Sequence, residues 1–146
     1  MSGKKIAFFC IPAHGHTNPM LSVAAELVKR GSRVRFYSFD EFEEKIVSTG
    51  AEFVSCSKYM PELNESEISG LKNVKITEMT IQDIRLTISM NDFLADEFET
   101  FKPDVVCSDP ACFRGKLNAW KFGVPLGNII SRYNYRKYTE NLRNSA

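Results

Sequence analysis

The chain alternates short apolar runs with amphipathic stretches that end at a glycine. Residues 5–11 contain two Phe and two Ile, which is typical of a strand buried on both faces of a parallel sheet. Such alternation predicts an α/β fold, a Rossmann-like open parallel sheet with helices on both faces. The expected elements of the first half are strands at residues 5–11, 33–38 and 51–54, and helices at residues 20–30 and 40–49 that stop before Gly31 and Gly50.

The second half is less regular. The spacing predicts a long helix over residues 80–101, bent near Asn91, then a strand at 104–108, a helix at 112–122 and a last strand at 124–130. The apolar residues of the long helix are interpreted as core or, alternatively, as a wall of a small-molecule pocket: Ile81, Ile84, Ile88, Leu94, Phe98 and Phe101. A lightly ordered loop is expected at residues 59–71, whose Glu62, Glu65 and Glu67 form a solvated face, and a short strand at 73–77.

Composition limits the function classes. With 146 residues the chain fits one domain, assigned to residues 1–130, followed by a polar tail at 131–146. The net charge of +1 gives no electrostatic reason to expect nucleic acid or an anionic membrane as partner. Four cysteines without a C-x-x-C pair favour a reduced, cytoplasmic protein, and no apolar run approaches the length of a membrane span.

The two histidines of the chain lie in one segment, residues 12–18, between the first strand and the first helix. Asn18 is expected to cap that helix, with Pro19 at its first position. If the strand order is 3-2-1-4-5, ligands bind where the order reverses, between the first strand and the strand at 104–108. His16 and Asp109 should then face each other, as a general base and the carboxylate that orients it.

Less specific interpretations of the same residues stay open. His14 and His16 could bind a metal or be ordinary loop residues, although the sequence offers no third histidine as ligand. Asp109 and Pro110 could simply cap the next helix. The segment matches neither G-x-G-x-x-G nor G-x-x-x-x-G-K-[ST], so a nucleotide bound through a phosphate loop is not expected here.

Longer motifs carry a family resemblance. The run Phe8-Phe-Cys-Ile-Pro-Ala-His-Gly-His-Thr-Asn-Pro-Met-Leu21 closely resembles the opening of GT-B glycosyltransferases of the macrolide and plant secondary-product type. Residues 24–31 and 49–53 fit the same family, as do Lys102-Pro-Asp-Val-Val-Cys-Ser-Asp109 and Trp120-Lys-Phe-Gly-Val-Pro125. The resemblance is collinear over residues 4–126 and is most specific at the H-G-H-x-N-P segment.

The resemblance implies a two-domain enzyme whose N-terminal half binds the sugar acceptor and whose C-terminal half binds a nucleotide sugar, usually UDP-linked. It implies that His16 is the general base of an inverting transfer and Asp109 its orienting partner. The substrate-binding residues that it implies are His14, Gly15, Thr17, Asn18 and Pro110. It implies no metal and no cofactor, since the nucleotide sugar is a co-substrate and the acceptor is a small hydrophobic molecule.

This chain departs from the family in length and after Leu126, where a basic tail rich in Tyr and Asn replaces the expected continuation. A chain without the donor-binding half is expected to be inactive alone, because positioning both reactants supplies much of the rate. Two alternatives remain open: one subunit of a split transferase, and a non-catalytic domain that binds a small molecule. A homodimer is compatible with each of them.

Overall fold

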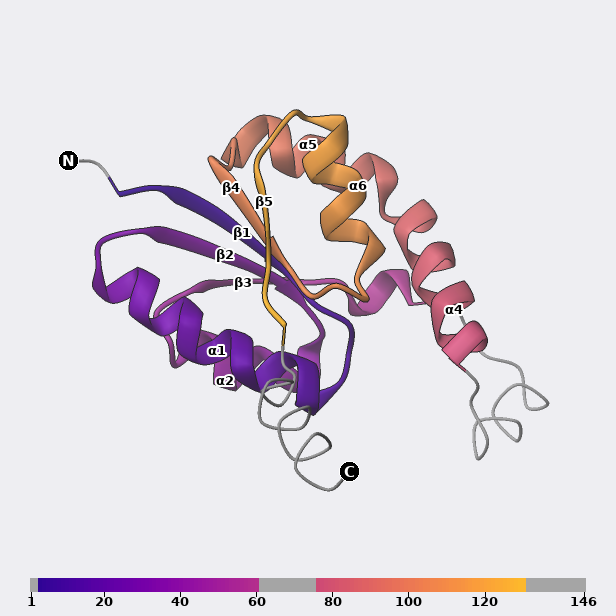
Figure 1. Cartoon of the computed structure of the whole chain (residues 1–146), viewed down its shortest axis with the longest axis horizontal. Helices are drawn as coiled ribbons and strands as arrows, with labels where there is room; N and C mark the ends of the chain where they lie inside the picture. Colours follow the sequence, from indigo (N-terminus) through magenta and orange to yellow (C-terminus); the bar gives the residue numbers. More distant parts are fainter. Residues whose placement is uncertain (1–2, 61–75, 131–146) are drawn as a thin grey trace, which may run out of the picture.

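The computed structural model describes residues 3–60 and 76–130. It contains one five-stranded parallel sheet with the order β3-β2-β1-β4-β5, which confirms the expected fold and strand order (Figure 1). Every neighbouring pair is parallel, and Phe9 of β1 lies opposite Ser108 of β4. The strands are β1 (Lys5–Phe9), β2 (Arg33–Ser38), β3 (Glu52–Ser55), β4 (Val105–Ser108) and β5 (Leu126–Asn128).

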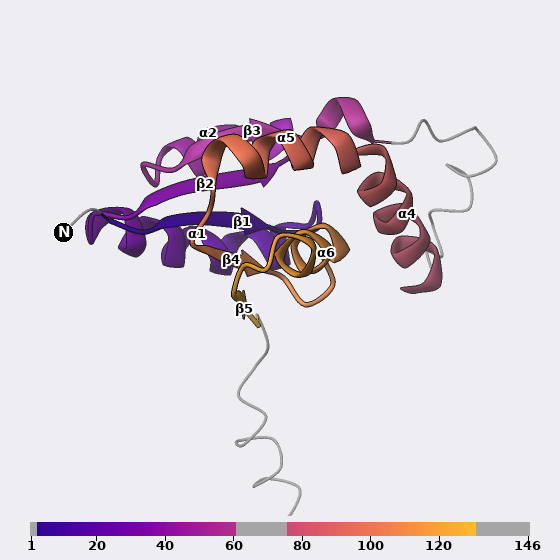
Figure 2. The same cartoon turned by 90° about the horizontal axis from the view of Figure 1, so that it is seen from above.

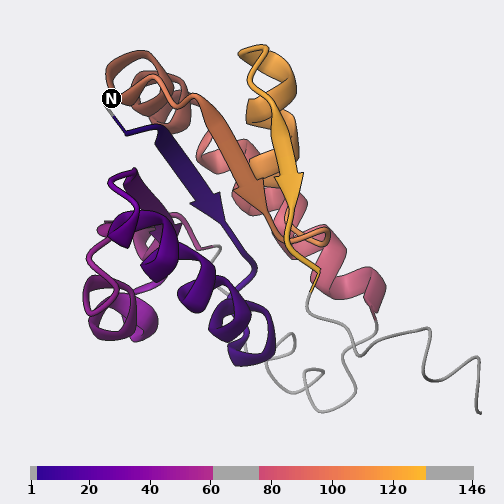
Figure 3. The same ribbon diagram turned by 60° about the vertical axis from the view of Figure 1, so that its left-hand side comes forward.

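Helices cover both faces of the sheet. The helical elements are α1 (His14–Lys29), η1 (Asp40–Phe42), α2 (Glu43–Val47), η2 (Ser57–Tyr59), α4 (Ile76–Ser89), α5 (Asn91–Phe101) and α6 (Phe113–Lys121). Helices α1 and α2 lie on one face, and α5 and α6 on the other (Figures 1 and 3). Right-handed crossovers require this division, because the chain moves from β1 toward β3 in its first half and from β4 to β5 in its second.

The sheet is buried between these layers by aromatic side chains. The rings of Phe9 and Tyr37 stack with their centroids 4.7 Å apart, and Phe98 of α5 covers Phe9 at 6.1 Å. The centroids of Phe8 and Phe36 lie 5.3 Å apart, and both side chains are fully buried. The apolar run at residues 5–11 therefore corresponds to a central strand, although the strand itself ends at Phe9.

Helix α1 begins earlier than expected. It starts at His14 after the N-terminal cap Ala13, so Asn18 is not the cap and Pro19 lies inside the helix. The Ala13 carbonyl accepts hydrogen bonds from the backbone N–H groups of His16 (3.0 Å) and Thr17 (2.9 Å). These bonds stabilise an additional helical turn before Pro19, and the Thr17 side chain in that turn is fully buried. The turn forms although Pro19 has no backbone N–H and so donates no hydrogen bond within the helix.

The expected long helix is two helices, with a break at Met90 close to the expected bend. In α5, the apolar residues Leu94, Phe98 and Phe101 are buried as expected. In α4 the expected core face is wrong, because Ile81, Ile84 and Ile88 are exposed and the buried residues are Asp83, Leu86 and Thr87. A buried ion pair of Asp83, described below, accounts for this rotation.

Some sequence expectations fall on residues 61–75 and 131–146, which are outside the described residues. They are the loop with Glu62, Glu65 and Glu67, most of the strand expected at 73–77, and the polar tail. Residues 76 and 77 of that expected strand are helical. Within the described residues, no helix combines the length and the apolar character needed to cross a membrane.

The packing of α6 on the sheet yields a stability prediction. A Cβ at Gly115 would lie 2.7 Å from Ser108 Cβ, closer than such atoms approach, and 3.1 Å from Phe9 Cβ, which is a tight contact. We expect Gly115→Ala to lower the free energy of unfolding by about 1–3 kcal/mol, since α6 must move away from β1 and β4. Urea denaturation followed by circular dichroism measures this loss.

Gly15→Ala is the matched control, because a Cβ at Gly15 in α1 has no atom within 4 Å among the described residues. Its free energy of unfolding should stay within about 1 kcal/mol of the wild-type value, with any gain coming from helix propensity. Equal losses in the two variants would contradict the close contact of α6 with the sheet.

Candidate active site

The candidate site lies where the strand order reverses. Strands β1 and β4 are parallel neighbours, so the segments that follow Phe9 and Ser108 leave the same edge of the sheet (Figure 3). From β1 the chain continues toward β2, whereas β4 continues toward β5 on the other side. No direct crossover connects β1 to β4, so no crossover covers the carboxyl ends of these two adjacent strands. Open α/β sheets bind ligands in the crevice at a position of this kind.

The structure brings His16 and Asp109 together at this point. His16 Nδ1 contacts Asp109 Oδ2, although the residues are 93 positions apart in sequence. The side chain of Asp109 is only 4% exposed, while that of His16 is 39% exposed. A carboxylate accepts a hydrogen bond from Nδ1–H, so the contact favours the tautomer whose Nε2 is unprotonated. That nitrogen is then available to accept a proton from a bound hydroxyl group.

Backbone hydrogen bonds hold Asp109 at the sheet edge. Its N–H donates to the Phe9 carbonyl (3.0 Å), which extends the pairing of β4 with β1 by one residue. Its Oδ1 accepts the backbone N–H of Ala111 at 2.7 Å. Its own carbonyl accepts from the backbone N–H of Cys112 (3.0 Å) and the Ser108 hydroxyl (3.1 Å). The carboxylate is therefore fixed before any ligand binds, and it fixes the imidazole in turn.

The other residues that the resemblance implies lie in different surroundings. His14 is exposed and its ring contacts Phe42 edge-on, with centroids 5.0 Å apart. Gly15, Asn18 and Pro110 are also exposed. Thr17 is fully buried and lies 3.4 Å from Cys10 Sγ, which places its side chain inside the domain rather than on a binding surface. The binding roles of these residues remain predictions.

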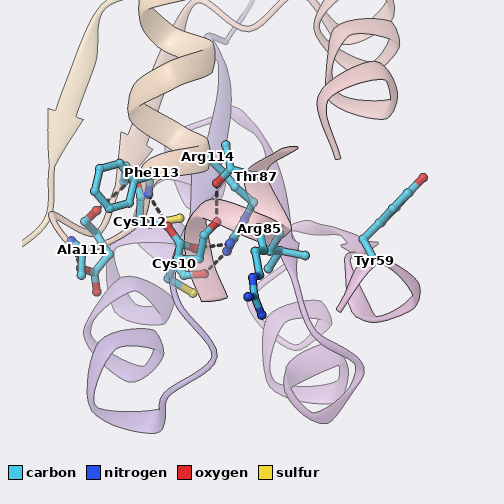
Figure 4. Close-up of polar contacts among 12 residues, drawn as sticks. Cys10, Tyr59, Arg85, Thr87, Ala111, Cys112, Phe113 and Arg114 are labelled. Carbon is cyan, nitrogen blue, oxygen red and sulfur yellow. Dashed lines mark hydrogen bonds and ion pairs between the residues drawn. The ribbon is translucent and has the colours of Figure 1, made fainter. Parts of the chain in front are cut away.

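The sequence reasoning missed Asp83 and did not assign a contact to Arg114. These side chains form a buried ion pair, with 7% and 0% of their surface exposed. Arg114 also contacts the Cys10 carbonyl, just after β1 (Figure 4). One signal was present in the sequence. Asp83 shares a helical face with Leu86, Thr87 and Met90, and a carboxylate on a buried face requires a partner.

The cysteines near the site are free thiols. Burial raises the pKa of Cys112 to about 11 and that of Cys56 to about 12. Burial also raises the pKa of Cys10, although a hydrogen bond from Thr17 opposes it. These thiols therefore stay protonated near neutral pH and are poor nucleophiles. In the described part of the chain, no group of three His, Cys, Asp or Glu side chains is arranged to hold a metal ion.

Curated relatives of the chain are glycosyltransferases. It is 37% identical over 135 residues to the NDP-glycosyltransferase YjiC of Bacillus licheniformis, covering 91% of this chain and 34% of the relative. It is 35% identical over 127 residues to the oleandomycin glycosyltransferase of Streptomyces antibioticus, covering 82% and 27%. The chain belongs to the macrolide and NDP-glycosyltransferase family. It spans about a third of the length of these family members. No family model matches it.

Solved structures of family members share the fold. The glycosyltransferase of kitacinnamycin superposes with a TM-score of 0.69 at 25% identity, covering 97% of this chain and 34% of that one. CalG4, the calicheamicin glycosyltransferase, gives a TM-score of 0.67 at 21% identity and covers 99% and 38%. The described domain is therefore a Rossmann-like domain of the GT-B glycosyltransferase type.

Proposed function

We propose that this domain is the acceptor-binding half of a UDP-sugar-dependent glycosyltransferase that transfers a hexose to a hydroxyl group of a small hydrophobic acceptor. The contact of His16 Nδ1 with the buried Asp109 carboxylate carries the proposal. It leaves Nε2 oriented as a base at the ligand-binding edge of the sheet. Relatives named as an NDP-glycosyltransferase and a UDP-glucosyltransferase support the nucleotide sugar as donor.

The proposed chemistry is a single displacement with inversion. His16 Nε2 takes the proton of the acceptor hydroxyl as its oxygen forms a bond to the anomeric carbon of the donor. The bond from that carbon to the diphosphate oxygen breaks, and the nucleoside diphosphate leaves with the electron pair. Asp109 stabilises the imidazolium ion, which later loses its proton to solvent. The step uses no metal and no covalent intermediate.

Apolar surface on α4 supports a hydrophobic acceptor. Ile81, Ile84 and Ile88 share one face of this helix and are 46%, 41% and 70% exposed. Helix α4 lies beside the carboxyl ends of the strands (Figure 3) and is joined to the site through Asp83. These residues are the proposed wall of the acceptor site.

A second observation concerns the donor-binding half. Phe113, Leu117 and Trp120 share one face of α6 and are 41%, 42% and 82% exposed. An apolar face of this kind favours contact with further polypeptide. That polypeptide could continue this chain or be a separate donor-binding chain. A homodimer that uses the same face is a third arrangement, which the mass of the particle in solution distinguishes.

The test compares three preparations in one transfer assay. They are this chain alone, this chain mixed with the separately expressed remainder of the Bacillus licheniformis relative, and residues 1–130 joined to that remainder, here called the joined transferase. UDP-glucose is supplied with a panel of phenolic and macrolide acceptors, and products are detected by mass spectrometry. We expect product from the joined transferase and none from the chain alone, because the donor is not positioned.

Product from the mixture would support a split enzyme. Absence of product from a folded joined transferase across the whole panel, with UDP-glucose bound, would contradict the proposed function. Binding of UDP-glucose is checked by calorimetry, so that failure of the donor half is recognised as such.

A further inference from the structure

Arg114 is the largest fully buried side chain of the described residues, and it lies at the start of α6 with 0% exposure. Its Nη1 forms an ion pair with Asp83 Oδ1 of α4, and its Nη2 donates a 2.8 Å hydrogen bond to the Cys10 carbonyl (Figure 4). One guanidinium group thus joins α4 and α6 to the end of β1. The planar guanidinium of arginine presents separate N–H groups to two partners in a fixed geometry, whereas lysine offers a single ammonium group.

Asp83 uses both of its carboxylate oxygens at this junction. While Oδ1 pairs with Arg114, Oδ2 accepts the backbone N–H of Phe113 at 2.7 Å. Phe113 is the first residue of α6, and the side chain of the N-cap residue Cys112 forms no capping hydrogen bond. A carboxylate from α4 therefore caps α6, where the helix dipole also favours negative charge.

Cys10 is the residue of this junction that is closest in sequence to the candidate base His16. Cys10 follows β1 directly, and only residues 11–13 separate it from α1, whose first turn carries His16. Cys10 Sγ also lies 3.4 Å from Thr17 Oγ1, in the residue after His16. The orientation of the chain at Cys10 therefore determines where the first turn of α1 lies relative to Asp109.

The ion pair is not an obvious gain in stability. Burying two charges costs several kcal/mol, and an apolar pair of similar volume is often as stable. Among the described residues, Arg114 Nε also has no hydrogen-bond partner, which adds to the cost. A positional requirement at the Cys10 carbonyl, which needs a donor reaching it from α6, accounts for an arginine here.

We propose that Arg114 is a positioning residue that holds His16 in contact with Asp109 by fixing the Cys10 carbonyl at the end of β1. The contact itself is structural, whereas its consequence for transfer rests on the proposed function. Without the guanidinium, the first turn of α1 shifts, the hydrogen bond of His16 Nδ1 to Asp109 weakens, and the imidazole is no longer limited to one tautomer.

The tautomer of His16 can be measured in this chain without any transfer reaction. The sequence contains only two histidines, so a sample labelled with ¹⁵N-histidine gives four ring nitrogen signals. At a pH of about 9 these signals separate the Nδ1–H form from the Nε2–H form. A spectrum of His14→Gln assigns the signals of His16. In the wild-type chain we expect His16 to be in the Nδ1–H form.

Arg114→Met should give ring shifts between those of the two forms, which indicate a mixture of tautomers. If Arg114→Met is too unstable to fold, the double variant Asp83→Leu with Arg114→Met replaces it. This variant removes both charges, so no unpaired carboxylate is buried and the domain stays folded. The same mixture is expected there. Arg114→Lys retains the charge but loses the planar fork that bonds Asp83 and the Cys10 carbonyl together, so its shifts should lie between wild type and Arg114→Met.

Arg35→Met is the matched control. Arg35 is a partly buried arginine that pairs with Glu52 and Glu97 on β3 and α5, away from β1's carboxyl end. Its loss should lower stability and leave the His16 signals unchanged. A folded Arg114→Met, Arg114→Lys or double variant with wild-type His16 signals would overturn the proposal.

Kinetics of the joined transferase provide a second readout. We expect Arg114→Met to lower kcat by about 10- to 100-fold, as for a misplacement of a catalytic group, with acceptor KM changed less than about threefold. Arg114→Met could change the tautomer of His16 while the wild-type joined transferase forms no product. That result would mean that the positioning role holds and the proposed function fails.

Discussion

Replacing His16 by Ala is expected to lower kcat of the joined transferase by about 10²- to 10⁴-fold, the usual contribution of a general base. The acceptor hydroxyl would have to lose its proton to solvent while its oxygen attacks. KM for the nucleotide sugar should hardly change, because no donor contact is assigned to this side chain. Initial rates at a saturating acceptor concentration, with UDP-glucose varied, measure both constants.

His14→Ala provides the comparison, since it removes the same side chain two positions away. The His14 ring contacts Phe42, and a binding role predicts an effect on acceptor KM rather than on kcat. Equal losses of kcat in the two variants would argue that both act through the fold of α1, and not that His16 is the base.

Asp109→Asn is expected to have an effect of similar size, about 10²- to 10⁴-fold on kcat. The amide has nearly the shape of the carboxylate and can still accept the Ala111 N–H at Oδ1. Its NH₂ group, however, would donate to His16 Nδ1, which places the proton on Nε2 and removes the basic lone pair from the site. Folding should be retained while the base is held in the wrong tautomer.

Asp104→Asn is the matched control at the other end of β4. Asp104 Oδ2 accepts the backbone N–H of Lys5 at 2.8 Å, far from the carboxyl ends of the strands. We expect kcat of this variant to equal that of wild type. If Asp109→Asn also retained wild-type kcat, the orienting role of Asp109 would be refuted.

Much of the fold follows from patterns that are local in sequence. The strand at Arg33–Ser38 has the expected bounds, and Gly31 and Gly50 follow helix ends with positive φ values of 87° and 86°. Each of these features depends on side chains within a few residues of one another. The strand order 3-2-1-4-5 does not follow from these local patterns and is a premise of the sequence analysis, which the structure confirms. Given that order, the proximity of His16 and Asp109 could be expected without coordinates.

The start of α1 and the inward face of α4 could not be predicted in this way. The first depends on a buried Thr17 beside Cys10, and the second on an ion pair between residues 31 positions apart. Helical spacing alone favours the side of α4 with three isoleucines as the core. Asp83 reverses that choice because leaving Arg114 buried and unpaired would cost more than exposing apolar surface.

The central claim is that His16 removes the proton of the acceptor hydroxyl, and a series of phenols of graded acidity tests it most directly. The ratio of wild-type to His16→Ala rates is measured in the joined transferase for each phenol. We expect the ratio to fall toward one as the phenol becomes acidic enough to ionise without a base. A ratio that stays the same across the series would contradict the claim.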